Sequence, residues 1–209
     1  MPRDYRDEPD ITVEPVPGLP EALPRGESIL WQGRPGSLAL ARDALSMGWV
    51  AGYFALLAFW RVGSLAAETG WAAAAPYAIP FLGLGAAACG LLWVIALVQA
   101  RATVYTITTA RVAMRVGAAL TLTLNLPFAR IAAADMARAP RGTGTIALTP
   151  VEETRLSYLV LWPHVRPWHM RQVKPALRCI PEAERVSEIL AEAVAAERAA
   201  PRISVMAAE

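Results

Sequence analysis

The stretch 70-GWAAAAPYAIPFLGLGAAACGLLWVIALVQA-100 decides the fold of this chain, because its 31 consecutive residues include no charged side chain. About 20 apolar residues of helix cross the ~30 Å hydrocarbon layer of a bilayer, and the residues from Ile79 to Val98 provide that length. Pro76 and Pro80 would interrupt a helix interior but are tolerated near a first turn. The stretch therefore predicts a membrane-spanning helix that begins near Pro80.

A second apolar run comes just before the first. Ala44 to Trp60 contains 17 uncharged residues, and the guanidinium of Arg61 can reach the membrane interface, so that the apolar stretch continues to Ala67. Together the runs predict a two-helix transmembrane hairpin over residues 44–100. A buried helix pair in a water-soluble protein is the alternative, and the length of the two uncharged runs disfavours it.

The hairpin divides the chain into four predicted parts: an N-terminal arm (1–43), the hairpin (44–100), a C-terminal domain (101–198) and a tail (199–209). The arm is acidic and rich in proline, which disfavours a core of its own. Within it, Ile29 to Trp31 form an apolar cluster. We interpret this cluster as a short interfacial element anchored by Trp31, and the alternative is a strand docked on the C-terminal domain.

Charges beside the two helices predict the topology. Lys and Arg near helix ends favour the cytoplasmic side, and such residues precede the first helix and follow the second: Arg34, Arg42, Arg101, Arg111 and Arg115. The first ten residues, MPRDYRDEPD, lack the apolar core of a cleavable signal. We therefore expect a multi-pass membrane protein with both termini in the cytoplasm.

After Arg101 the apolar period changes from helical to two, which is typical of half-buried strands. Seven strands are predicted, at about 104–108, 111–116, 120–126, 131–138, 143–149, 156–162 and 176–180. The residues from Pro163 to Pro175 are predicted to form a loop. A final helix begins at Pro181, and one of its faces carries Val186, Leu190 and Val194, so it is expected to cover a core. The fold class is α+β.

Gly48 and Gly52 form a small-xxx-small pair in the first helix. Such pairs let helix backbones approach closely in lipid. The second helix of the hairpin is the favoured partner, and a helix of another protein, or of a second copy in a homo-oligomer, is the alternative.

No catalytic motif is visible in the sequence. It contains no phosphate-cradling G-x-x-x-x-G-K, no HExxH and no G-x-S-x-G. Glu152 and Glu153 are adjacent and would point to opposite faces of a strand, which makes them poor partners in acid-base chemistry. Cys89 and Cys179 are too far apart to suggest a metal clip or a disulfide framework. We expect a non-enzymatic protein with no metal and no cofactor.

Basic residues are concentrated in the C-terminal domain, where residues 130–178 hold 8 basic and 3 acidic side chains. Each Lys or Arg near an anionic bilayer contributes roughly 1 kcal/mol to binding. We expect contact with an anionic lipid surface through Arg130, Arg138, Arg141, Arg171 and Lys174. Nucleic acid is a poorer partner, because aromatic side chains are few and the domain is tethered.

Three segments resemble the bacterial PH domains: YTITTARVAMRVG (105–117), LPFARIAAADM (126–136) and IPEAERVSEIL (180–190). ESILWQGRP (27–35) is similar to the segment that precedes the membrane helices in such proteins. The resemblance implies a PH-like antiparallel β-barrel capped by a C-terminal helix.

The chain from about Glu14 to Glu197, including YLVLWPHVRPW (158–168), resembles the PuhB-type photosynthetic complex assembly proteins of purple bacteria. This resemblance implies a non-enzymatic, membrane-anchored assembly factor in the intracytoplasmic (inner) membrane. Its partners would be subunits of the photosynthetic reaction centre or of the core antenna, bound through protein-protein contacts. The alternative is a general membrane-tethered PH-like scaffold that binds lipid or another membrane protein.

The loop after residue 162 is the candidate client-binding region. It carries both histidines of the chain between and beside two tryptophans, and the candidate residues are Trp162, His164, Arg166, Trp168 and His169. Trp and Arg are common anchors of protein interfaces. The alternative is that one imidazole ligates the magnesium of a bacteriochlorophyll.

Overall fold

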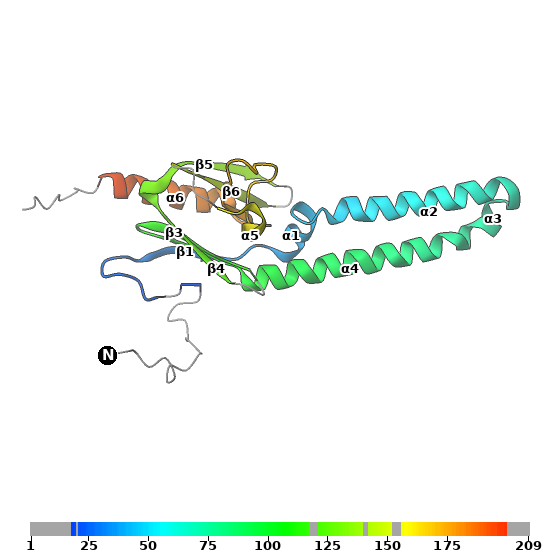
Figure 1. Cartoon of the computed structure of the whole chain (residues 1–209), viewed down its shortest axis with the longest axis horizontal. Coiled ribbons are helices and arrows are strands. Elements are labelled where there is room, and N and C mark those ends of the chain that lie inside the picture. Colours follow the sequence, from blue (N-terminus) through cyan, green and yellow to red (C-terminus); the bar gives the residue numbers. More distant parts are fainter. Residues whose placement is uncertain (1–17, 20, 118–120, 140–141, 152–155, 200–209) are drawn as a thin grey trace, which may run out of the picture.

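The computed structural model of this protein describes residues 18–19, 21–117, 121–139, 142–151 and 156–199. A long helical hairpin extends from one end of a two-sheet domain (Figure 1). The hairpin consists of α2 (Met47–Thr69) and α4 (Ile79–Ala102), connected by α3 (Trp71–Ala74) and the short 3₁₀ turn η1 (Ala75–Ala78). The second helix thus begins beside Pro80, as the sequence predicts.

Both hairpin helices are long and apolar enough to cross a membrane. At 1.5 Å per residue each extends for about 35 Å, which exceeds the ~30 Å hydrocarbon layer. Their large side chains point outward: Trp49 is 84% exposed and Phe59 is 68% exposed. The helices are therefore not the buried pair of a soluble core.

Gly85 of α4, and not the predicted glycine pair, lies in close contact with the other helix. A Cβ atom built on Gly85 would lie 2.7 Å from the Cβ atom of Phe54, whereas Cβ atoms on Gly48 and Gly52 would meet nothing within 4 Å. The favoured prediction that Gly48 and Gly52 pack against the second helix is therefore wrong. The reason is rotational, since these glycines lie on a face of α2 that points away from α4.

The domain contains two antiparallel sheets. The first has the order β1-β2-β3-β4, from β1 (Ile29–Gly33), β2 (Val104–Thr108), β3 (Arg111–Val116) and β4 (Leu122–Pro127). The second has the order β5-β6-β7, from β5 (Ile131–Arg138), β6 (Thr143–Pro150) and β7 (Ala176–Pro181). The two sheets do not close into the predicted barrel. Pro127 ends β4, and the 3₁₀ turn η2 (Phe128–Arg130) redirects the chain into the other sheet.

The core lies between the sheets and under α6 (Ala183–Ala199). Tyr105 and Met114 enter it from the first sheet, Leu148 enters from the second, and α6 adds Val186 and Leu190. These positions confirm the predicted apolar faces of the strands and of the last helix.

Ile29–Gly33 forms a strand paired with β2, so its interpretation as an interfacial element is wrong and the alternative is right. Glu27, two residues before this strand, binds side chains of the β2–β3 hairpin and helps to hold the strand in place. The Glu27 carboxylate accepts two hydrogen bonds from Arg111, at 2.9 and 3.0 Å, and one from the Thr108 hydroxyl at 2.6 Å. The first sheet therefore combines a strand from before the hairpin with three strands from after it.

Residues 156–162 do not form the predicted strand. They contain the single helical turn α5 (Tyr158–Leu161), in which the Leu161 N–H donates to the Ser157 carbonyl at 3.2 Å. The turn buries Leu161 and leaves Leu159 and Val160 exposed. Neighbouring apolar residues on opposite sides gave the segment its strand-like pattern, but among the described residues no strand pairs with it.

A short helix, α1 (Ser37–Asp43), connects β1 to the hairpin. Leu40 and Ala41 pack on Ala96 and Ala100 near the end of α4, and on Cys179 of β7. The elbow formed by α1 thus fixes the hairpin to both sheets.

Candidate functional site

The loop that carries the two histidines is anchored in the interior of the protein by His164. This side chain is 1% exposed, its Nδ1 lies 2.6 Å from the Tyr105 hydroxyl, and its Nε2 lies 3.1 Å from the Thr103 hydroxyl. Thr103 is the residue that follows α4 and its hydroxyl donates to the Gln99 carbonyl at 2.8 Å. The loop is therefore bound directly to the end of the hairpin.

The partners assign the tautomer of His164. The Thr103 hydroxyl already donates its proton to Gln99, so it must accept a proton from Nε2. The Tyr105 hydroxyl accepts the backbone N–H of Arg178 at 3.3 Å and donates to Nδ1. The result is one continuous chain of hydrogen bonds from β7 to α4.

Arg178 completes this junction from the side of β7. Its Nη1 donates to the Pro163 carbonyl at 3.3 Å, and its Nη2 donates to the Asp43 carbonyl at 3.1 Å. One buried guanidinium therefore ties the loop to the last residue of α1. We call Thr103, Tyr105, His164 and Arg178 the junction network.

Burial shapes the ionisation of the junction network. Burial, with a smaller contribution from the Arg178 charge, lowers the pKa of His164 to about 4, so the imidazole is neutral at pH 7. Burial also raises the pKa of Tyr105 far above its usual value and that of Cys179 to about 11. The network is thus a neutral hydrogen-bonded structure around a single arginine charge.

His164 is therefore not part of an exposed contact surface. Both of its ring nitrogens are occupied inside the protein, so it is also unavailable as a pigment ligand in this structure. The sequence could not reveal this, because Tyr105 lies 59 residues and Thr103 lies 61 residues away along the chain.

The other four predicted client-binding residues lie outside. Trp168 is 87% exposed, and Trp162 is 42% exposed. Arg166 donates from Nη1 to Asp135 Oδ2 at 3.0 Å, and the half-buried His169 has its Nδ1 2.8 Å from the Pro167 carbonyl. Three large apolar side chains that the sequence reasoning left out join them, namely Leu159, Val160 and Met170.

We call these seven residues the loop surface: Leu159, Val160, Trp162, Arg166, Trp168, His169 and Met170. Leu159 and Val160 belong to α5, and the other five residues belong to the segment between α5 and β7. Both lie at the hairpin end of the domain (Figure 1). Five large apolar side chains exposed within twelve residues of chain are typical of an interaction site.

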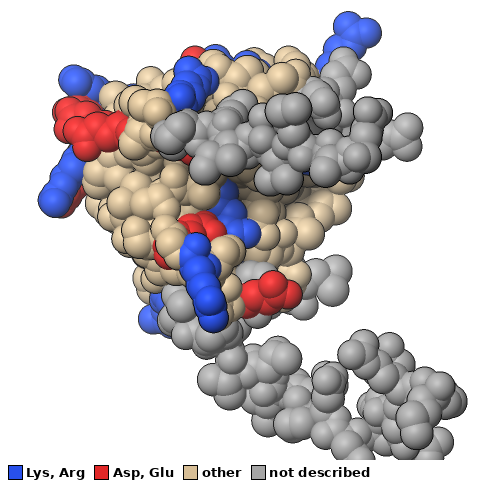
Figure 2. All heavy atoms as spheres, turned by 90° about the vertical axis from the view of Figure 1, so that its left-hand side faces the viewer, with Lys and Arg blue, Asp and Glu red and all other residues tan. Residues whose placement is uncertain are grey.

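The predicted basic residues do not form one surface. Arg130 and Arg138 lie at opposite ends of β5, which at ~3.3 Å per residue spans about 26 Å, and Arg138 is at the hairpin end with Asp43. Arg130 is therefore far from the hairpin. Figure 2 shows the end of the domain that faces away from the hairpin, where charges of both signs are scattered over a largely uncharged surface.

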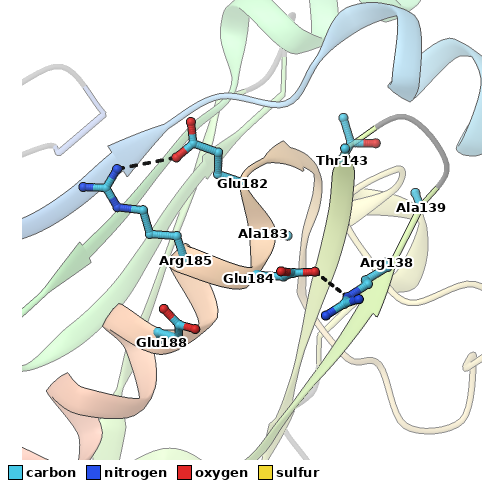
Figure 3. A pocket seen from close by; sticks show the side chains of 9 residues that line it. Arg138, Ala139, Thr143, Glu182, Ala183, Glu184, Arg185 and Glu188 are labelled. Carbon is cyan, nitrogen blue, oxygen red and sulfur yellow. Dashed lines mark ion pairs between the residues drawn. The ribbon is translucent and has the colours of Figure 1, made fainter.

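Arg138 is engaged by an acidic partner. Its guanidinium forms an ion pair with Glu184 across an open hollow of about 550 Å³ between the β5–β6 turn and the start of α6 (Figure 3). Arg171 is exposed and Lys174 is half-buried on the loop, and Arg141 lies outside the described residues, as do Glu152 and Glu153. In the described part of the chain, no three His, Cys, Asp or Glu side chains gather as metal ligands.

The comparison with protein families is decisive for the fold. The family model described as a bacterial PH domain matches residues 46–194, which is more than half of the chain. The chain belongs to the bacterial PH domain family. The first sheet also includes β1 (Ile29–Gly33), which lies before the residues that match the family model.

A relative with a similar length is known. The bacterial PH protein is 48% identical over 196 residues to a protein of Rhodobacter capsulatus named "Uncharacterized 23.7 kDa protein in puhA 5'region". The match covers 93% of this chain and 92% of the relative. No solved structure matches the bacterial PH protein significantly.

Proposed function

We propose that this chain is a non-enzymatic, membrane-anchored assembly factor for the photosynthetic reaction centre and its core antenna. The observation that supports the proposal most is the 48% identity, over nearly the whole chain, to a protein named for its position in the puhA 5' region. The genomic position given in the name of that relative supports a role connected with photosynthesis. A PH-like domain is a common binding module, which fits a factor that acts through contacts and not through chemistry.

The loop surface is the proposed client-binding site. It presents Trp162, Arg166, Trp168 and His169 beside the base of the hairpin, and the junction network fixes their supporting chain to the end of α4. A client embedded in the same membrane would meet this surface first. Aromatic and arginine side chains on a rigid support are suitable anchors for such a contact.

Absorption spectroscopy of a strain that lacks this chain tests the proposed role. Membranes grown under conditions that induce photosynthesis should lose the near-infrared bands of the reaction centre while pigment synthesis continues. Complementation with the natural chain should restore the bands. An unchanged spectrum would contradict the assembly role and favour a general membrane scaffold that binds lipid or another membrane protein.

The membrane placement is proposed as a spanning hairpin in the inner, intracytoplasmic membrane, with both termini in the cytoplasm. Two exposed valines provide a matched test. Val160 is 60% exposed on α5 at the hairpin end, and Val151 is 59% exposed at the far end, where its N–H donates to the Arg130 carbonyl.

Spin labels on Val160→Cys and Val151→Cys, in a Cys89→Ala background in lipid nanodiscs, report the depth of each site. Cys179 should label poorly, because it is buried and its pKa is raised to about 11. We expect the label at 160 to be more accessible to oxygen and less accessible to a water-soluble nickel complex than the label at 151. Equal accessibilities would place the loop surface away from the bilayer.

A further inference from the structure

The strand β5 has an unpaired edge. It is the outermost strand of the second sheet, and seven of its eight residues are exposed. The Ala139 N–H donates to the Thr143 carbonyl at 2.8 Å, so the odd-numbered residues of β5 point their backbone groups toward β6. The backbone N–H and C=O groups of Ala134 and Met136 therefore point to the other edge, where no described residue bonds to them.

A hollow lies on each face of the sheet beside this edge. On one face a hollow of about 420 Å³ lies between β5 and α6, and Ala134, Met136, Leu190 and Val194 give it an apolar lining. On the other face a hollow of about 410 Å³ lies between β5 and the loop that follows α5. An added strand needs this arrangement, because its successive side chains point to opposite faces of the sheet.

The second hollow differs chemically from the first. Three arginines and two aspartates line it, namely Arg138, Arg166, Arg178, Asp43 and Asp135. Arg138 is paired with Glu184 and Arg166 with Asp135. Arg178 instead donates to two backbone carbonyls, and among the described residues no carboxylate pairs with its charge. Arg178 is 7% exposed, and among the described residues its Nε has no hydrogen-bond partner. A buried charge without an opposite partner is costly, and a carboxylate placed in this hollow would lie near the guanidinium charge of Arg178 and offset part of that cost.

We propose that β5 binds an extended peptide segment as an additional strand, with apolar side chains in the hollow beside α6 and acidic side chains in the arginine-lined hollow. This proposal rests on the proposed function, because the segment would belong to the membrane-protein client. The partner is thus a chain of alternating apolar and acidic residues. Its site shares Arg166 with the loop surface but does not include Trp162 or Trp168.

The probe is a fluorescein-labelled peptide of eight residues, the length of β5, that alternates valine and glutamate. Its fluorescence anisotropy is measured with the full chain in nanodiscs. We expect a saturable rise, and at least about tenfold weaker binding for the same peptide with lysine in place of glutamate. N-methylation of one alternate set of peptide nitrogens should weaken binding by at least about tenfold, and N-methylation of the other set should not.

Protein variants test the same edge. Ala134→Pro removes an N–H from the unpaired edge without removing a bond to β6, and should lose binding, whereas Ala134→Ser keeps the N–H and should bind. Ala191→Trp fills the apolar hollow from α6 and provides a test if the proline variant does not fold. No anisotropy change up to about 1 mM protein, equal binding of the lysine peptide, or full binding by a folded Ala134→Pro variant would each overturn the proposal.

These measurements use purified protein and a synthetic peptide. A failure of the assembly role, seen as an unchanged spectrum in the deletion strain, would therefore leave the binding result intact. Absent binding beside a lost reaction-centre spectrum would overturn the strand site alone.

Discussion

The hairpin and the domain place the same kinds of side chain in opposite environments. In α2, Trp49 and Phe59 point outward, whereas in the domain Tyr105 and Phe128 are almost fully buried. The domain also encloses polar groups, and most of them have hydrogen-bond partners inside the protein, as at His164. The difference teaches that the two regions suit different surroundings: the hairpin presents an apolar surface long enough to cross a membrane, and the domain encloses its large apolar side chains.

The junction network lies where the two regions meet. Its side chains are buried inside the domain, and the hydrogen bond between His164 and Thr103 connects it to the end of the hairpin. Disturbing it should therefore affect the domain most, and disturbing the glycine contact inside the hairpin should affect the domain least.

The largest effect is expected for His164→Ala. This change leaves a cavity and removes the partners of two buried hydroxyl groups, so the free energy of unfolding of the domain should fall by about 3 kcal/mol. Denaturant titration in detergent, followed by tryptophan fluorescence, measures it.

His169→Ala is the matched control, because His169 is half-buried and, within the described part of the chain, its ring is hydrogen-bonded only to the Pro167 carbonyl. It should change the unfolding free energy by less than about 0.5 kcal/mol. Equal losses for the two variants would contradict the structural role of the junction network.

The second prediction concerns pH. The pKa of His164 is about 4 in the folded protein and 6.5 in the unfolded chain, so the unfolded state binds the proton more tightly. The contribution of neutral His164 to the free energy of unfolding should be fully present above pH 6.5. The free energy of unfolding should decrease as the pH falls from 6.5 toward 4, by up to about 3 kcal/mol. Unfolding titrations across this range measure the slope, and His164→Gln should remove it. A slope that persists in His164→Gln must come from other groups.

The third prediction tests whether β1 is part of the domain. Glu27→Gln weakens the pairing with Arg111, and the free energy of unfolding should fall by about 2 kcal/mol. Limited proteolysis should then cut the chain faster between residue 21 and the hairpin. Glu21→Gln, at an exposed position before β1, should leave both measurements unchanged. If the two variants behave alike, the strand contributes little to the domain.

The smallest effect on the domain is expected from the hairpin. Gly85→Ala places a Cβ atom against Phe54 and should destabilise the helix pair by about 1–2 kcal/mol in a detergent unfolding assay, with the domain unchanged. Gly83→Ala meets nothing within 4 Å and should leave the helix pair unchanged or stabilise it by up to about 1 kcal/mol. A loss of domain stability in Gly85→Ala would show that the two regions are more tightly coupled than their contacts suggest.

The sequence alone determined the features that depend on local pattern. A long uncharged run set the start of α4, period-two alternation located β2, β3 and β4, and helical periodicity identified the buried face of α6. These patterns are reliable because each reports how neighbouring residues partition between an apolar and a polar environment.

The tertiary structure decided everything that joins distant residues. The partner of Ile29–Gly33, the burial of His164 and the close contact at Gly85 all depend on segments brought together from far along the chain. A local pattern shows that a residue prefers an apolar or polar environment, but not which distant side chain will provide it. Hence the hairpin and most strands were predictable, whereas the junction network and the two hollows beside β5 were not.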